Sequence, residues 1–155
     1  MNKKYRKELG DPDIKLVGLE IWVHGRQFPD MDDYWDGNWL RVTAHCSANG
    51  SSVWADGPFI HLPELYCWYE SSSMLNDSLK GIATLDCMEP ELSATIKAES
   101  LGQLTMEVNI TPNHLEQEHK YYFELDQSYL ASFLSGCKSV LEKFPIKGDN
   151  ESNRT

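Results

Sequence analysis

Three stretches of strict alternation between apolar and polar residues constrain the fold of this chain more than any other feature. Apolar residues occupy every second position within residues 91–99, 104–110 and 120–126. Successive side chains of a strand point to opposite faces of a sheet, so this pattern predicts strands with one buried and one solvated face. We therefore expect these segments to form a mainly antiparallel sheet.

Further strands are predicted upstream, because this part of the chain is rich in residues that favour strands. The Asn49-Gly50 pair is a strong signal for a tight hairpin turn. Gly18 is a possible bulge, and Asp56-Gly57-Pro58 is expected to break the chain. The strands expected here are residues 14–23, 39–46 and 51–55.

Two segments have helical spacing. The first starts near Pro63, which suits the first turn of a helix, and its end is left open by the serines at 71–73. The second runs from Leu130 to Phe144, with Ser128 expected as its N-cap. The predicted fold is α+β: a mainly antiparallel β-sheet of about six or seven strands with two helices, the C-terminal helix packed on the sheet.

The length of 155 residues and a hydrophobic fraction of 41% fit one domain with a real core. We expect a single α+β domain over residues 13–146. A flexible basic tail is expected at residues 1–12 and a disordered polar tail at residues 147–155.

The formal charge is -10, and it is unevenly distributed. Residues 1–8 contain four of the 14 basic residues and one of the 24 acidic residues, so the remainder carries -13. Nucleic-acid binding relies on Lys and Arg displacing counterions, so we expect no direct nucleic-acid partner. A cationic partner would be attracted, although acidity can also serve solubility alone.

Cellular location is inferred from features that the sequence lacks. No run approaches the roughly 20 apolar residues of a membrane helix, and no apolar signal core follows the basic start. The four cysteines, Cys46, Cys67, Cys87 and Cys137, are widely spaced and are expected to be buried free thiols. The expected location is cytoplasmic, without membrane contact.

The candidate binding site is an acidic, aromatic segment between two predicted strands. Four carboxylates fall within seven residues, and the two aromatic residues among them are good interface anchors. A solvated surface turn is one alternative reading. In another, Trp35 and Trp39 belong to the core and Asp36-Gly37-Asn38 form the turn between loop and strand. The candidate partner-binding residues are Asp30, Asp32, Asp33, Tyr34, Trp35 and Asp36.

Metal binding and catalysis are less favoured by the same residues. A calcium loop that begins at Asp30 would need glycine where Trp35 stands and a bidentate acid where Arg41 stands. Known catalytic motifs are missing from the sequence. The chain is expected to be no enzyme, with no catalytic residues, no metal and no cofactor. One enzyme alternative stays open, a pocket lined by Trp22, His24 and Tyr122.

The stretch from Gly25 to Leu40 reads G-x-Q-F-P-x-x-x-D-x-W-D-x-N-W-L and resembles the WapI family of toxin-immunity proteins. The CMEP-x-L motif at residues 87–92 and FELDQSYL at residues 123–130 are also similar to that family, so the resemblance spans about residues 14–146. It implies an immunity protein that neutralises the toxic C-terminal domain of a cognate bacterial toxin by stoichiometric binding. A nuclease toxin, as in contact-dependent inhibition, fits the acidic charge. A regulatory or structural interaction protein remains the alternative, and the oligomeric state is open.

Overall fold

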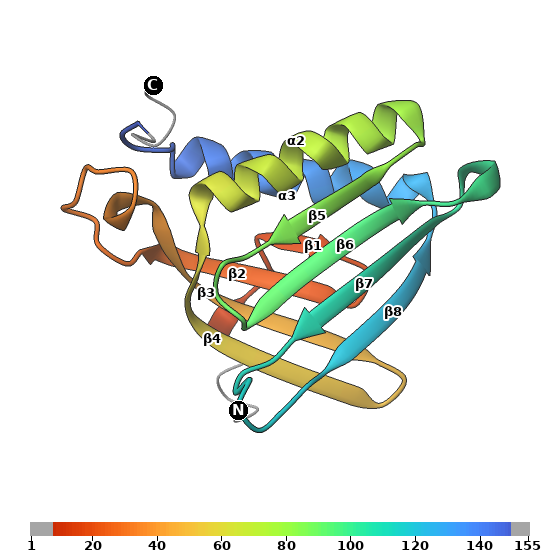
Figure 1. Cartoon of the computed structure of the whole chain (residues 1–155), viewed down its shortest axis with the longest axis horizontal. Helices are drawn as coiled ribbons and strands as arrows, with labels where there is room; N and C mark the ends of the chain where they lie inside the picture. Colours follow the sequence, from red (N-terminus) through yellow and green to blue (C-terminus); the bar gives the residue numbers. More distant parts are fainter. Residues whose placement is uncertain (1–7, 150–155) are drawn as a thin grey trace.

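Eight strands in two antiparallel sheets form the frame of the computed structural model, which describes residues 8–149. Each sheet keeps its strands in sequence order (Figure 1). Sheet A comprises β1 (Ile14–Leu16), β2 (Leu19–Arg26), β3 (Trp39–Ala48) and β4 (Ser51–His61). Sheet B comprises β5 (Ile82–Asp86), β6 (Leu92–Ala98), β7 (Leu104–Ile110) and β8 (Lys120–Leu125).

Two helices, α2 (Leu62–Ser78) and α3 (Leu130–Lys143), complete the core. Helix α2 packs on β5, α3 packs on β1, and the two helices contact each other along one side of the sheets (Figure 1). The rings of Trp68 and Phe133 meet edge to face between the helices, with centroids 4.7 Å apart. Short 3-10 turns are η1 (Asp36–Asn38), η2 (Ser100–Gly102) and η3 (Gln127–Tyr129).

The α+β class and the packing of the C-terminal helix are confirmed. The alternating residues of β6 and β7 point their apolar side chains inward, where all except the partly buried Ala98 are almost fully buried. The strand count was too low: there are eight strands in two sheets within residues 8–149, rather than six or seven.

One missing strand was hidden in residues 14–23, which form a hairpin rather than one strand with a bulge. Val17 adopts a left-handed φ of 48°, and Leu16 pairs with Leu19 across the turn. A β-branched residue rarely takes this conformation, so the apolar run concealed the turn. Gly18 is required by close packing, since a Cβ atom there would lie 2.2 Å from the Ser47 carbonyl oxygen.

The Asn49-Gly50 turn is confirmed, with φ values of 49° and 85° that suit a tight hairpin. The break predicted at residues 56–58 was wrong, because β4 continues to His61. The register of β3 and β4 shifts between Leu40 and Val42, opposite this segment. The Gly-Pro signal therefore marks an irregularity within a strand.

Helix α2 continues through the three serines and ends at Ser78. Ser71 donates its hydroxyl to the Cys67 carbonyl 2.8 Å away, which satisfies this polar side chain within the helix. The cap predicted before α3 was wrong, because the Asp126 side chain accepts the Ser128 N–H at 2.8 Å. This contact stabilises η3, which leads into α3.

All four cysteines are free, as predicted, but they are not uniformly buried. Cys46 and Cys137 lie in the core, whereas Cys67 is exposed. Burial raises the pKa of both core thiols to about 12. The core thiols are therefore unreactive at neutral pH.

Parts of the predicted tails, residues 1–7 and 150–155, lie outside the residues that the structure describes. Within the described part, Trp22 Nε1 donates to the Gly10 carbonyl at 3.0 Å, and Lys147 makes several contacts given below. None of the helices in residues 8–149 has the length and apolar character needed to span a membrane.

Candidate partner-binding site

Residues 27–38, here called the acidic loop, connect β2 to β3 at one end of the molecule. The loop lies near the start of α2 and the end of α3 (Figure 1, orange, left). The four predicted carboxylates, Asp30, Asp32, Asp33 and Asp36, are all exposed. Negative charge is therefore presented to solvent from a single projecting segment.

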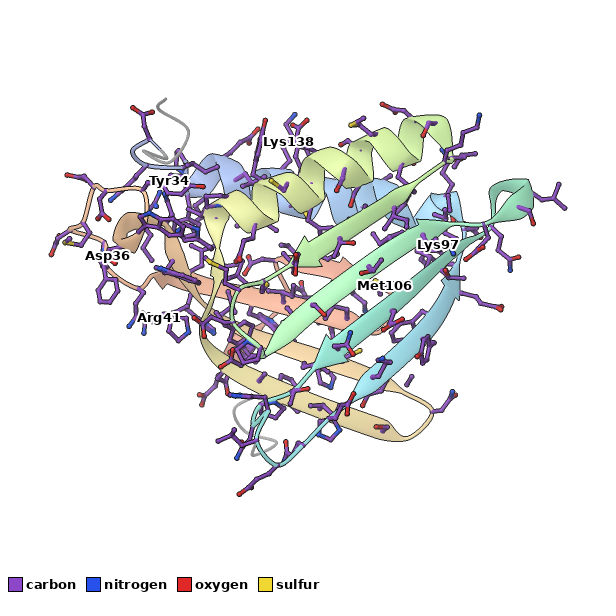
Figure 2. All side chains as sticks on the ribbon, in the orientation of Figure 1. Tyr34, Asp36, Arg41, Lys97, Met106 and Lys138 are labelled. Atoms are coloured by element: carbon purple, nitrogen blue, oxygen red, sulfur yellow. The ribbon has the colours of Figure 1, made fainter. Side chains whose placement is uncertain are left out.

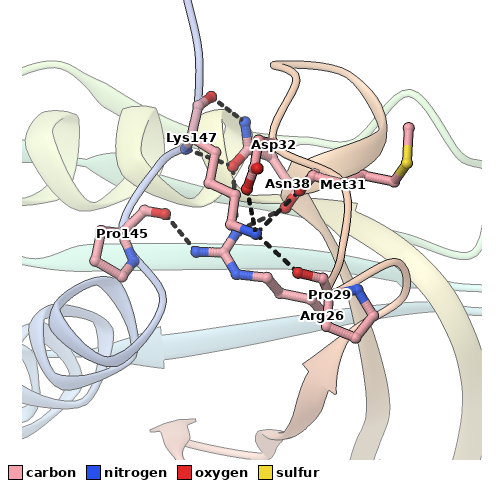
Figure 3. A network of polar contacts seen from close by, with 8 residues as sticks. Arg26, Pro29, Met31, Asp32, Asn38, Pro145 and Lys147 are labelled. Atoms are coloured by element: carbon pink, nitrogen blue, oxygen red, sulfur yellow. Dashed lines mark hydrogen bonds and ion pairs between the residues drawn. The ribbon is translucent and has the colours of Figure 1, made fainter.

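Asn38 anchors the base of the acidic loop from a fully buried position. Its Nδ2 donates to the Tyr34 carbonyl at 2.7 Å and to the Lys147 carbonyl at 2.9 Å. Its Oδ1 accepts the Lys147 N–H at 2.8 Å (Figure 3). One amide side chain thus joins the loop to a segment more than 100 residues later in the chain.

Arg26 ties the same two segments together from the end of β2. Its guanidinium donates to the Gly37 carbonyl at 2.6 Å and also to the Pro145 carbonyl (Figure 3). Lys147 donates from Nζ to the carbonyls of Pro29 and Met31, both at 3.0 Å. These contacts satisfy loop carbonyls that no strand or helix pairs.

The predicted carboxylates differ in the roles they play. Asp32 forms an ion pair with Lys147 at 3.4 Å, and Asp33 accepts the Asp36 N–H at 2.9 Å. Asp30 and Asp36 make no side-chain hydrogen bond or ion pair among those found in residues 8–149. Two of the four carboxylates thus hold the loop. The other two, Asp30 and Asp36, are exposed on it, and Figure 2 shows Asp36 on this projecting segment.

His61 joins the acidic loop to α2 and is buried. Its Nε2 lies 3.1 Å from the carbonyl oxygens of Tyr34 and Trp35, so this nitrogen carries the hydrogen. The side chain also accepts the Glu64 N–H at the start of the helix, while Glu64 accepts the His61 N–H at 2.9 Å. This reciprocal capping box fixes the loop relative to the helix.

Aromatic rings surround His61. The Trp35 ring stacks on it with an interplanar angle of 10°, and the Tyr34 ring meets it edge to face. Trp35 nevertheless remains 51% exposed, so it is no core residue. Trp39 belongs to the same cluster, with its ring centroid 4.6 Å from that of His61 and the two planes tilted by 41°.

Exposed apolar side chains gather around this end of the molecule. Phe28, Met31 and Trp35 project from the acidic loop. Neighbouring segments add Tyr66 of α2, Met88 after β5 and Ile146 after α3. Exposed apolar residues that are rimmed by polar residues mark protein interaction sites.

Several of these residues carry no local signal in the sequence. Asn38, His61 and Lys147 hold the loop through contacts with distant segments, and Tyr66, Met88 and Ile146 reach the surface from three other elements. The pattern of aspartates located the segment but could not reveal the residues that fix or border it.

The pocket imagined around Trp22, His24 and Tyr122 does not form. Trp22 and His24 project from the outer face of sheet A, where Trp22 stacks on Trp54. Tyr122 lines a separate hollow of about 550 Å³ on the outer face of sheet B, with Lys97 and Glu107. The inward residues of both sheets belong to one buried core, so these outer faces point away from each other.

A polar chain on sheet A links Glu20, His45 and Ser52. His45 Nδ1 lies 2.9 Å from Glu20 Oε1, and His45 Nε2 lies 2.7 Å from the Ser52 hydroxyl oxygen. Cys46 points to the core, as expected for the neighbour of His45 in a strand. Across residues 8–149, no three His, Cys, Asp or Glu side chains come together in a way that would hold a metal ion.

Comparison with known proteins defines the class. The family model described as the immunity protein WapI-like family matches residues 12–145, most of the chain. This chain therefore belongs to the WapI-like family of immunity proteins. No curated protein matches it.

A distant structural likeness exists to the structure of the plant transcriptional regulator PBF-2. The sequence identity is 10%, and the likeness covers 81% of this chain and 75% of that chain. The TM-score of 0.46 is too low to support a conclusion about function.

Proposed function

We propose that this chain binds a cognate bacterial toxin domain and neutralises it by stoichiometric contact through the acidic loop and its apolar surroundings. The observation that carries the proposal is the pre-organisation of this loop. Asn38, His61 and Lys147 hold it in place, while Trp35 and the aspartates remain exposed. A rigid aromatic anchor binds without the entropic cost of ordering a flexible loop.

A nuclease domain in the cytoplasm is the toxin that this surface suits best. Such an enzyme needs a basic surface to bind phosphates. A complementary acidic surface accelerates encounter and disfavours wrong partners. The chain would act by occupying or covering that surface, without chemistry of its own.

The test is a titration of a toxin domain encoded beside the gene for this chain, with RNA cleavage as the readout. Loss of cleavage near one equivalent supports neutralisation by binding. Binding without inhibition moves the contact away from the catalytic surface of the toxin. No binding and unchanged cleavage would reject that toxin and favour a regulatory or structural role.

The role of charge is tested separately with the double variant Asp30→Asn, Asp36→Asn. These side chains hold nothing within the described part of the chain, so the loop should keep its shape while two charges are lost. Association with the toxin domain should slow severalfold at low salt and become less sensitive to salt. Asp77→Asn, on an exposed residue near the far end of α2, is the matched control.

One observation favours hydrolysis as a second candidate function. The order carboxylate, imidazole, hydroxyl in Glu20, His45 and Ser52 is that of a serine hydrolase triad. Labelling of Ser52 by a fluorophosphonate, lost in Ser52→Ala and His45→Gln, would support this activity. If the native protein is not labelled, Glu20, His45 and Ser52 form a polar network on sheet A and have no hydrolase activity.

A further inference from the structure

A hollow of about 270 Å³ lies between the acidic loop and the start of α2. One wall is aromatic and consists of Tyr34, Trp35 and His61. The other walls come from α2, from the end of β5 and from the segment after it, and comprise Pro63, Glu64, Cys67, Asp86 and Met88. Three segments that are distant in the sequence thus border one hollow that is open to solvent.

The hollow is electrically negative. Its lining in the described part of the chain contains the carboxylates of Glu64 and Asp86 and no lysine or arginine. The thiol of Cys87 experiences the same negative electrostatic field. Its pKa is raised first by burial and then by the charges of Glu64 and Asp86. A cation that entered this space would be attracted by both carboxylates, of which Glu64 also interacts electrostatically with His61.

Glu64 is especially suited to an incoming cation. Partial burial raises the pKa of its carboxyl group, because the charged form has lost part of its hydration. Its Oε1 accepts the His61 N–H and its Oε2 accepts the Met88 N–H at 2.7 Å. Each oxygen keeps a further lone pair, so the fixed carboxylate can accept two more hydrogen bonds.

The aromatic wall favours a flat cation. Trp35 has one ring face stacked on His61 at a centroid distance of 5.5 Å, yet half of the residue remains exposed. A planar guanidinium can lie against an indole and donate two parallel hydrogen bonds to a carboxylate. A lysine ammonium can use the charge but not the planar geometry.

We propose that this hollow is a receptor for one arginine side chain of the partner protein. The inference deepens the proposed function and rests on it for the identity of the partner. The specific claim is chemical: the space between Trp35, Glu64 and Asp86 recognises a guanidinium group. The arginine of a basic toxin surface would insert beside Trp35 and anchor the acidic loop.

The test uses the whole chain and a small probe rather than the toxin. N-acetyl-arginine amide is titrated while NMR follows the indole N–H signal assigned to Trp35. N-acetyl-citrulline amide, which has nearly the same shape without the charge, is the matched ligand. We expect a saturable shift with arginine at about 10 mM and no saturable shift with citrulline at the same concentration.

Variants test whether the probe binds in the hollow. Asp86→Asn should weaken arginine binding about threefold, since it removes one partly screened charge. In the Trp35→Ala variant, binding is followed by the backbone N–H signal of Met88, which also borders the hollow and donates to Glu64. Trp35→Ala should abolish binding, whereas Asp77→Asn at the far end of α2 should leave it unchanged. Asp86 makes no side-chain hydrogen bond or ion pair found in residues 8–149, so its replacement should not disturb folding.

Equal binding of arginine and citrulline overturns the inference, as does arginine binding that survives Trp35→Ala. Absence of a saturable shift for arginine also overturns it. The toxin titration fails or succeeds separately: probe binding without toxin binding rejects the proposed function alone. Toxin binding without probe binding rejects the arginine receptor alone.

Discussion

Replacing Asn38 with alanine should loosen the acidic loop and destabilise the whole domain. Asn38 is fully buried and makes three hydrogen bonds of 2.7–2.9 Å, one to Tyr34 and two to Lys147. A buried hydrogen bond contributes about 1 kcal/mol net, so the loss should be about 3 kcal/mol. A weaker contact from Arg26 at 3.3 Å is lost as well.

The free energy of unfolding is measured by urea denaturation followed by tryptophan fluorescence. Asn109→Ala is the matched control, because Asn109 donates one hydrogen bond of 3.2 Å to the Ser93 hydroxyl. The control should lose about 1 kcal/mol or less. Hydrogen exchange at the Gly37 amide, which donates to the Asp33 carbonyl at 3.1 Å, reports on the loop itself.

The reasoning is refuted if Asn38→Ala loses no more stability than Asn109→Ala and Gly37 exchange stays as slow as in the native protein. Faster Gly37 exchange with a smaller global loss would show that the loop detaches before the domain unfolds. Either destabilisation or detachment identifies Asn38 as the residue that fixes the loop.

Three further predictions concern the surface, the core and the thiols. Trp35→Ala should weaken partner binding by about 2 kcal/mol or more, roughly 30-fold, because a central exposed tryptophan is a typical hot spot. Calorimetry would show this, and a change in affinity below about threefold would remove Trp35 from the interface. Gly18→Ala should cost about 3 kcal/mol or more, since its Cβ would lie 2.2 Å from the Ser47 carbonyl oxygen; an unchanged melting temperature would contradict this. Iodoacetamide at pH 8 should modify the exposed Cys67 first, and the core thiol Cys46, with a pKa raised to about 12, only after unfolding. Mass spectrometry of the modified peptides gives the order, and early Cys46 modification would show that the core opens readily.

Much of the fold follows from local periodicity. The alternation in β6 and β7 reports directly on a half-buried sheet, and the apolar stripe of α3 reports on a helix against a core. The Asn49-Gly50 pair predicted the hairpin turn correctly, because both residues accept positive φ values.

The errors have a common physical cause, since tertiary contacts override local preference. Val17 takes a left-handed conformation because β1 folds back on β2, and Pro58 is accommodated within β4. Local signals therefore misplaced strand ends where the surrounding sheet decides the geometry.

The candidate site was predictable only as a segment. Composition marked the aspartates and Trp35, and the structure shows that they are exposed. Asp33 holds the loop, whereas Asp30 makes no such contact within residues 8–149, and this division depends on backbone geometry. The contacts of Lys147 depend on chain segments more than 100 residues apart, which no window of sequence can connect.

The contacts of Asn38 and Arg26 with residues 145–147 have a consequence for synthesis. The acidic loop leaves the ribosome early, but the carbonyl and N–H groups that fix it belong to residues made more than 100 positions later. A nascent or prematurely terminated chain lacks these carbonyl and N–H groups, so its loop has no partners for Asn38 and Arg26 at residues 145–147. The acidic loop thus reaches its final shape only after residues 145–147 have been synthesised and have bound to it.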